Sequence, residues 1–212
     1  VDWTNPWGEH KYVDNIEIRE DGGTPAFLQT IRTALAIQLK DKMGVQNILA
    51  REEELHHIVW NKFIEFENVY VLADNFSKRL GVYSFYIDNL HFNLAVQLLN
   101  DRYGIQVRGG CSCAGTYGHI LLDVDKAFSQ NITNHIDGGD LSLKPGWVRL
   151  SLHPTMTNDE VHYIMSAIQD LSINHTHWAQ DYIYDNSTNE FIYKDNNFSE
   201  QNRRRIKDWF KL

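Results

Sequence analysis

The sequence predicts an α+β fold, a small mixed α/β domain in which long N-terminal helices precede a small sheet packed with helices. Apolar residues recur at helical spacing through the first part of the chain, between residues 25 and 66. From residue 69 onward, short aromatic and β-branched runs alternate with helical segments. Helices first, and then strands mixed with helices, is an order that favours a mixed layer structure. A chain of 212 residues is long enough to bury one core.

Residues 1–24 show no clean apolar period and are interpreted as an extended connector that ends in a Gly-Gly-Thr segment. Thr24 is a good N-cap and Pro25 a good first helical residue, so a helix is predicted from Pro25 until Gly44 ends it. Its apolar stripe consists of Leu28, Ile31, Leu35 and Leu39. A second helix is expected over residues 47–66, with an apolar side made by Leu55, Ile58, Val59 and Phe63.

The middle of the chain is expected to alternate between short strands and helices. Strands are predicted at residues 69–72, 79–87 and 105–108, and helices at residues 91–104 and 119–130. The strand at 105–108 leads directly into a glycine-rich loop that carries both cysteines of the chain. Residues 134–146 are rich in Gly, Asp and Pro and are expected to form a loop.

A strand and a helix complete the predicted small domain, which spans residues 25–172. The strand at 147–153 alternates, so one face is expected to hold Val148, Leu150 and Leu152 and the other Trp147, Arg149 and Ser151. The helix opens with a capping box from Thr157 to Glu160 and continues with a strong apolar stripe. Residues 173–212 are more polar and are interpreted as a C-terminal extension, a hairpin at 181–194 followed by a last helix.

Composition argues against several classes of protein. The net charge of −8 disfavours general nucleic-acid binding, which needs a basic surface, and Arg203 to Arg205 are interpreted as a solvated helix face. No apolar run approaches the roughly 18 residues of a membrane helix, so no membrane contact is expected. Two cysteines are too few for a secreted disulfide scaffold, and no leader precedes Val1. We therefore expect a cytoplasmic protein.

The first candidate site is the Gly-Gly-Thr-Pro segment at residues 22–25. Backbone N–H groups at a helix start attract anions, and glycines allow a phosphate to approach closely. The hydroxyl of Thr24 adds a further donor. A plain capped helix after a turn is the alternative interpretation.

Cys111 and Cys113 admit four interpretations. One is a nucleophilic thiolate on a glycine-rich loop, favoured by the charge of Arg108. A second is a zinc site that also uses His119, although a C-x-C pair alone is a weak signal. The others are a redox pair and two ordinary free thiols.

Arg149 is the last candidate that the pattern singles out. It lies in the middle of a predicted strand, on the face opposite the apolar residues. A guanidinium at such a position can hold a carboxylate bidentately. The alternative is a solvent-facing charge on a half-exposed strand.

Taken together, several segments resemble the class V aminotransferase-like family of pyridoxal-phosphate enzymes, which includes cysteine desulfurases and selenocysteine lyases. The segments are Gly-Thr-Pro before a long helix, then GVYSF, YGIQVRGGCSCAG and PGWVRLSLHPTMTNDEV, in the family's order. The resemblance covers roughly residues 18–172, and it corresponds to the C-terminal small domain of fold-type I enzymes only.

The resemblance implies roles for individual residues. Counting from Arg108, Cys113 matches the persulfide-forming cysteine of the family, and Cys111 is an extra one. Arg149 matches the arginine that binds the substrate carboxylate. Gly23 and Thr24 match the Gly-Thr that reaches the cofactor phosphate, usually across a dimer interface. The resemblance therefore implies pyridoxal phosphate, an amino-acid substrate, a homodimer and a possible sulfur-acceptor protein.

The sequence also departs from the family. The lysine that binds the cofactor, and the aspartate at its pyridine nitrogen, belong to a large domain well before the Gly-Thr segment. His10-Lys11 is similar to the family's His-Lys pair but lies too close to Thr24 to be that lysine. We therefore expect the C-terminal fragment of an enzyme that removes sulfur or selenium from an amino acid, inactive by itself. The alternative is a stand-alone metal- or thiol-binding module that uses Cys111 and Cys113.

Overall fold

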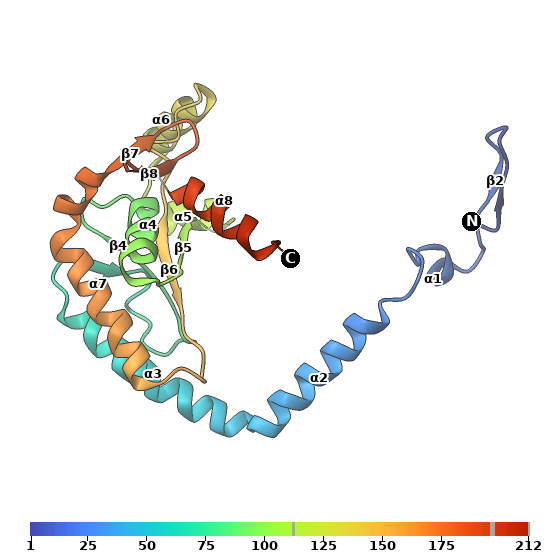
Figure 1. The fold of residues 1–212 in the computed structure, drawn as a ribbon, viewed down its shortest axis with the longest axis horizontal. Coiled ribbons are helices and arrows are strands. Elements are labelled where there is room, and N and C mark those ends of the chain that lie inside the picture. The colour runs from blue at the N-terminus through green and yellow to red at the C-terminus, as the bar shows by residue number, and fades with distance from the viewer. Residues whose placement is uncertain (112, 196–197, 212) are drawn as a thin grey trace. The chain divides into compact units, whose positions relative to one another are not determined.

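The structure is a computed structural model, and it describes residues 1–111, 113–195 and 198–211. These residues form two compact units, Val1–Leu49 and Ala50–Leu212, whose ribbons are drawn in Figure 1. The chain passes from one unit to the other within a helix, α3 (Val45–Glu65). Among the described residues, none of the helices combines the length and the apolarity needed to cross a bilayer.

The first unit contains a two-stranded ribbon and two helices. The ribbon pairs β1 (Trp3–Thr4) with β2 (His10–Lys11), and it is followed by α1 (Ile16–Arg19) and α2 (Phe27–Met43). The expected connector over residues 1–24 therefore contains short elements of its own.

The prediction that Thr24 caps the long helix is wrong. The helix α2 begins at Phe27, with Ala26 at the N-cap and no side-chain hydrogen bond to the first turn. Pro25 instead accepts a hydrogen bond from the backbone N–H of Phe27 at 2.8 Å, which makes a tight turn before the helix. The C-terminus is as predicted, because Gly44 has a φ of 81° and its N–H bonds the carbonyl of Lys40.

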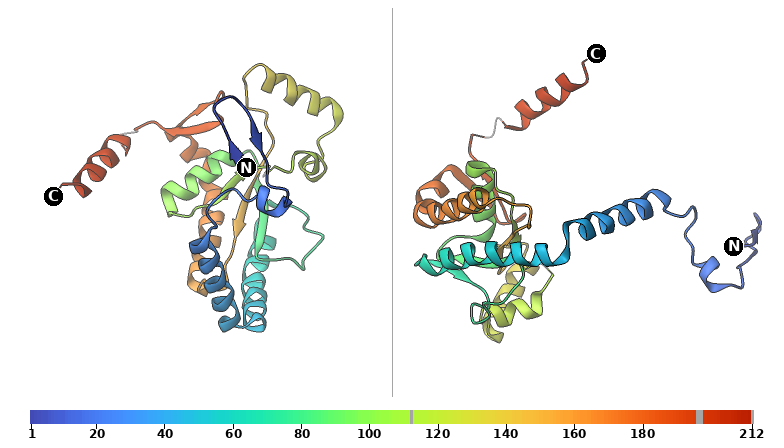
Figure 2. Two further views of the ribbon diagram at one scale, coloured as in Figure 1. Left: turned by 90° about the vertical axis from the view of Figure 1, so that its right-hand side faces the viewer. Right: turned by 90° about the horizontal axis from the view of Figure 1, so that it is seen from below.

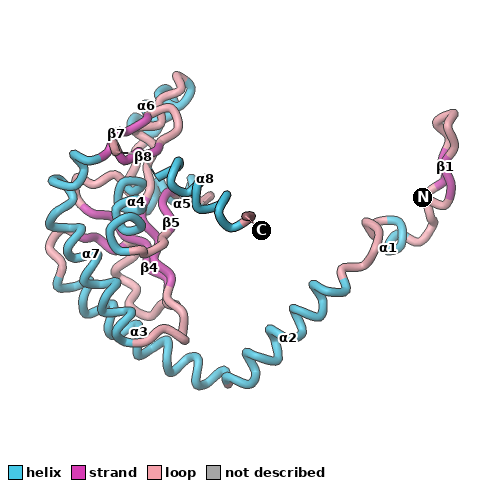
Figure 3. The backbone as a smooth tube through the Cα atoms, viewed as in Figure 1, coloured by secondary structure: helices cyan, strands magenta, loops and turns pink. Residues whose placement is uncertain are grey.

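The second unit holds a four-stranded sheet and the helices around it. In chain order its further elements are β3 (Val69–Val71), β4 (Val82–Ile87), α4 (Phe92–Tyr103), β5 (Arg108–Gly110), α5 (Gly115–Leu121), α6 (Lys126–Asp137), β6 (Trp147–Ser151), α7 (Asn158–Trp178), a 3-10 turn (Ala179–Asp181), β7 (Tyr182–Asp185), β8 (Glu190–Tyr193) and α8 (Phe198–Trp209). Figure 3 distinguishes the strands from the helices by colour.

The sheet is antiparallel throughout and has the order β3-β4-β6-β5. The register places Tyr83 opposite Leu150 and Phe85 opposite Val148, so these four side chains share one face. That face and the apolar stripes of α3, α4 and α7 form one buried core. The ribbons of α3 and α7 run beside the strands of the sheet in the left view of Figure 2. This architecture confirms the predicted mixed fold with helices packed on a small sheet.

Several predicted elements have other bounds in the structure. The strand expected at 79–87 begins at Val82, and the loop expected at 134–146 begins only after α6 ends at Asp137. The strand expected at 105–108 begins at Arg108, because the N–H of Ile105 still bonds the carbonyl of Leu99 and closes the end of α4. The helix expected at 119–130 is two helices, α5 and α6. The left-handed Asp123 (φ 51°) ends the first, and Asp125 caps the second by accepting the N–H of Phe128.

The helix α7 extends beyond the predicted boundary at residue 172. It continues to Trp178 because Leu171 and His175 still face the core. The capping box of Thr157 and Glu160 and the hairpin of β7 and β8 are both present as predicted. The compact units divide between Leu49 and Ala50, so the functional division after residues 24 and 172 stays a prediction.

Candidate functional site

Arg149 lies in β6, the strand between β4 and β5. Its partners in the register are Ser84 on β4 and Arg108 on β5. Residues directly opposite each other on antiparallel strands point to the same face, so these three side chains cross the sheet in one row. This row is on the face opposite the core.

The two arginines of this row lack a counter-charge within the described part of the chain. Arg108 is exposed and Arg149 is partly buried, and neither forms an ion pair with a described carboxylate. The Nε atom of Arg149 is buried and has no hydrogen-bond partner among the residues that the structure describes. Like charges directly opposite on paired strands destabilise a sheet, and an unpartnered buried donor costs free energy. An anion bound between them would lower both costs.

The cysteine loop leaves the sheet next to this row. Gly110, the last residue of β5, is paired with Trp147, two residues before Arg149 on β6. Cys111 is partly buried, and Cys113 is exposed with a left-handed φ of 64°. The N–H of Ala114 donates to the carbonyl oxygen of Cys111 at 2.8 Å. The sheet therefore fixes the start of the loop beside Arg149 and leaves the thiol of Cys113 accessible.

The glycines at the base of the cysteine loop lie where the backbone packs closely against a side chain. Gly109 and Gly110 belong to β5, where a Cβ added to Gly109 would lie 3.0 Å from Cδ2 of Phe92. A Cβ added to Gly146 would lie only 2.6 Å from Cε1 of the same ring. These glycines allow the start of β6 and the end of β5 to pack against Phe92. They hold the base of the loop in place.

Trp147 shares the face of Arg149, as predicted, but it is buried because α5 covers it. Its indole packs on Gly118, where an added Cβ would lie 3.3 Å from Cζ3 and 3.7 Å from the Cβ of Cys111. The sequence did not indicate these packing partners, nor the place of Ser84. They depend on strand register and on helix placement, which no local pattern reports.

The zinc interpretation of the cysteine loop does not fit the geometry. Both ring nitrogens of His119 are engaged, with Nδ1 2.7 Å from the carbonyl oxygen of Gly115 and Nε2 2.8 Å from Oγ of Ser129. Within the described residues, no group of three or more His, Cys, Asp or Glu side chains is arranged to hold a metal ion.

Gly23 and Thr24 belong to the first unit of the chain, and Cys113 and Arg149 to the second. Within the described part of the chain, a Cβ added at Gly22 or Gly23 would meet no atom within 4 Å, and the first turn of α2 carries no side-chain cap. Open glycines before an uncapped helix start fit a phosphate group. Lys11 is ion-paired with Asp2 at 3.4 Å.

The family of the chain follows from its similarity to known proteins. Residues 7–164 match the family model described as "Aminotransferase class-V". The chain belongs to the class-V aminotransferase family. This match confirms the resemblance found in the sequence, and it ends before the hairpin and α8.

Two curated relatives are similar over parts of their length. One is a "Cysteine desulfurase" of Haloferax volcanii, 29% identical over 47% of this chain and 23% of that protein. The other is a "Probable cysteine desulfurase" of Halobacterium salinarum, 27% identical over 71% of this chain and 31% of that protein. The chain thus covers less than a third of either relative.

Two solved structures have a similar fold. An apo cysteine desulfurase from Thermococcus onnurineus NA1 gives a TM-score of 0.54 at 25% identity, over 80% of this chain and 36% of that one. The cysteine desulfurase CsdA from Escherichia coli gives 0.51 at 17% identity, over 73% of this chain and 32% of that one. The second likeness concerns the fold alone.

Proposed function

We propose that these residues form the C-terminal part of a pyridoxal-phosphate enzyme that removes sulfur or selenium from an amino acid. Family membership and the named cysteine desulfurases among the relatives support this proposal. The fraction of each relative that the chain covers supports the view that it is one part of a larger enzyme. The observation that carries the proposal is the buried, unpartnered Nε of Arg149 beside the base of the cysteine loop.

In the proposed enzyme, Arg149 binds the α-carboxylate of the substrate. A guanidinium has parallel N–H donors that match the two oxygens of a carboxylate, and burial strengthens the pairing. Arg108, directly opposite on β5, adds positive charge on the same face. The substrate is thereby oriented over the sheet with its side chain free to meet the loop.

Cys113 receives the sulfur atom in this proposal. Its thiolate sulfur attacks the sulfur of the substrate, a sulfur–sulfur bond forms, and the carbon–sulfur bond breaks with its electron pair left on the substrate carbon. Protonation of that carbon gives alanine, and Cys113 retains a persulfide for an acceptor. The exposed position of Cys113 suits both the attack and the later transfer to an acceptor protein.

Pyridoxal phosphate, when bound, supplies the electron sink that makes the carbon–sulfur bond labile. Gly23 and Thr24 would hold its phosphate at the start of α2, together with the N–H groups of the first helical turn. The lysine and the aspartate that contact the cofactor in this family match no position of the 212 residues. A homodimer, with Gly23 and Thr24 contributed across its interface, and a cytoplasmic location are part of the same proposal.

The test uses the full reading frame that contains this chain, assayed for sulfide and alanine formed from cysteine. Cys113→Ser is expected to abolish sulfide release, while Cys111→Ser leaves it near normal. Arg149→Lys is expected to raise KM for the amino acid, because a lysine cannot pair bidentately with a carboxylate. Loss of turnover in Cys111→Ser, with normal turnover in Cys113→Ser, would contradict the assignment. The rate of turnover with selenocysteine, compared with the rate with cysteine, would decide between the two substrates.

A further inference from the structure

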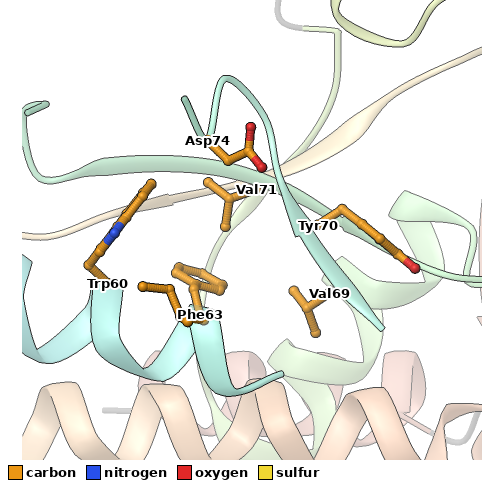
Figure 4. A pocket seen from close by; sticks show the side chains of 7 residues that line it. Trp60, Phe63, Val69, Tyr70, Val71 and Asp74 are labelled. Atoms are coloured by element: carbon orange, nitrogen blue, oxygen red, sulfur yellow. The ribbon is translucent and has the colours of Figure 1, made fainter. Parts of the chain in front are cut away.

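Cys111 is the one thiol of the chain that the proposed function leaves without a role. Both cysteines lie in the loop after β5, and the lining of the small pocket between α3 and β3 contains neither of them. That pocket, drawn in Figure 4, has Trp60 and Val71 among its walls. The guanidinium of Arg79 lies 4.7 Å from the ring centroid of Trp60, so the chain already supplies a cation there. The group whose chemistry is still to be explained is the thiol of Cys111.

The two cysteines of the loop have different surroundings. Cys111 directly follows β5 and is partly buried, and a Cβ added to Gly118 of α5 would lie 3.7 Å from its own Cβ. Cys113 is exposed. A dissolved reactant therefore reaches Cys113 more readily than it reaches Cys111, which is shielded at the base of the loop.

The two thiols are nevertheless close enough to react with each other. Cα atoms of residues two positions apart are no more than about 7 Å apart, and a disulfide bridges Cα atoms that are about 4.4 to 6.8 Å apart. The N–H of Ala114 donates to the carbonyl oxygen of Cys111 at 2.8 Å, which keeps the backbone of Cys111 close to the residue that follows Cys113. Cys113 has a φ of 64°, so the backbone at this residue is not extended.

We propose that Cys111 is the resolving cysteine of the loop, an inference that rests on the proposed function because it starts from the persulfide of Cys113. The thiolate of Cys111 attacks Sγ of Cys113, a sulfur–sulfur bond forms between the two residues, and the bond from Sγ to the outer sulfur breaks. The electron pair of that bond leaves with the outer sulfur as hydrosulfide. Cys111 is oxidised and the outer sulfur is reduced, so the step requires no further oxidant.

This step makes the loop a switch that responds to the supply of a sulfur acceptor. An acceptor thiol that removes the outer sulfur first leaves both cysteines free, and turnover continues. Without an acceptor, the step leaves Cys113 in a disulfide, where it cannot act as a nucleophile, and turnover stops. A disulfide across so short a loop is strained and is readily reduced by a dissolved thiol, which restores the enzyme.

The resolving step is tested on the reduced 212-residue chain with one equivalent of glutathione persulfide, without oxygen or added thiol. This donor transfers its outer sulfur to the exposed Cys113. The parent chain is expected to release sulfide, and its tryptic peptide 109–126 is expected to have lost both thiol hydrogens in mass spectrometry. Cys111→Ser is expected to hold the persulfide at least about tenfold longer, because an intramolecular thiol acts at a much higher effective concentration than a dissolved one.

Two further variants separate this step from other thiol reactions. Cys113→Ser is expected to release no sulfide, because the partly buried Cys111 is left without a second thiol. Cys111→Ala is expected to hold the persulfide as long as Cys111→Ser does, and an unchanged circular dichroism spectrum shows that both variants keep the fold. Equal persulfide lifetimes in the parent and in Cys111→Ser, or a disulfide between two chains in place of one within a chain, would overturn the proposal.

The proposed function is tested separately, by the alanine formed from one equivalent of cysteine in the full-length enzyme. Alanine formation that leaves a stable persulfide on Cys113 would overturn the resolving role and leave the proposed function standing. Sulfide and an intraloop disulfide from glutathione persulfide, without alanine from cysteine, would support the chemistry of the two thiols and contradict the proposed function. An excess of dithiothreitol in the sulfide assay cleaves the persulfide directly, so the loss of Cys111 is expected to matter only when added thiol is absent.

Discussion

Replacement of Gly146 by alanine gives a direct measure of how tightly the base of the cysteine loop is packed. The new Cβ would lie 2.6 and 2.7 Å from Cε1 and Cδ1 of Phe92 and 2.8 Å from the Cα of Gly110. Real Cβ atoms do not approach this closely, so the ring or the backbone has to move. Phe92 is 8% exposed and stacks on His91 with ring centroids 4.5 Å apart, which leaves it little room.

The expected cost of Gly146→Ala is that of an overpacked core, about 1–3 kcal/mol in the free energy of unfolding. Urea unfolding followed by circular dichroism measures this as a lower midpoint with an unchanged slope. Gly115→Ala is the matched control, because its Cβ would meet no atom of the described residues within 4 Å and its φ is not left-handed. That variant is expected to change stability by less than about 0.5 kcal/mol.

A double variant tests the cause. Phe92→Leu removes the ring atoms that the new Cβ would meet, so adding it to Gly146→Ala is expected to cost less than the sum of the two single effects. The coupling is expected to be about 0.5–3 kcal/mol. The assignment of Gly146 to close packing against Phe92 is refuted if Gly146→Ala is as stable as Gly115→Ala. It is also refuted if the effects of Gly146→Ala and Phe92→Leu on the free energy of unfolding are additive.

Three further predictions follow from other parts of the chain. Thr157→Ala removes the capping box of α7 and is expected to lower the free energy of unfolding by about 1 kcal/mol in urea. Burial holds the pKa of His91 below its ordinary value of 6.5. The unfolded chain therefore takes up a proton at higher pH than the folded chain does, and the free energy of unfolding is expected to fall as the pH drops below 6.5. His91→Asn keeps an N-cap acceptor for α4 and is expected to make the free energy of unfolding depend less on pH in this range. The same pH dependence in the variant and in the parent chain would exclude His91 as its cause. Stoichiometric pyridoxal phosphate followed by borohydride is expected to leave no adduct on the 212-residue chain, and a modified Lys11 found by mass spectrometry would contradict this.

The sequence by itself determined the features that depend on near neighbours in the chain. The stripe of α7, its capping box at Thr157 and the glycine ends of α2 and α4 each follow from spacing within a few residues, and the structure has them as predicted. The ordered motifs also identified the family, because they preserve residue types at positions where chemistry requires them. Arg149 could be placed on the polar face of its strand by alternation alone.

Only the tertiary structure decided which residues of different strands lie opposite each other. The pairing of Arg108 with Arg149, and of Ser84 with the same arginine, depends on strand register, and strands distant in sequence carry no local signal of it. The packing of Phe92 against Gly146 likewise joins segments more than fifty residues apart, and it leaves no room for a Cβ at position 146. Local patterns report only the backbone preferences of a segment, whereas contacts between segments depend on how the whole chain buries its apolar surface.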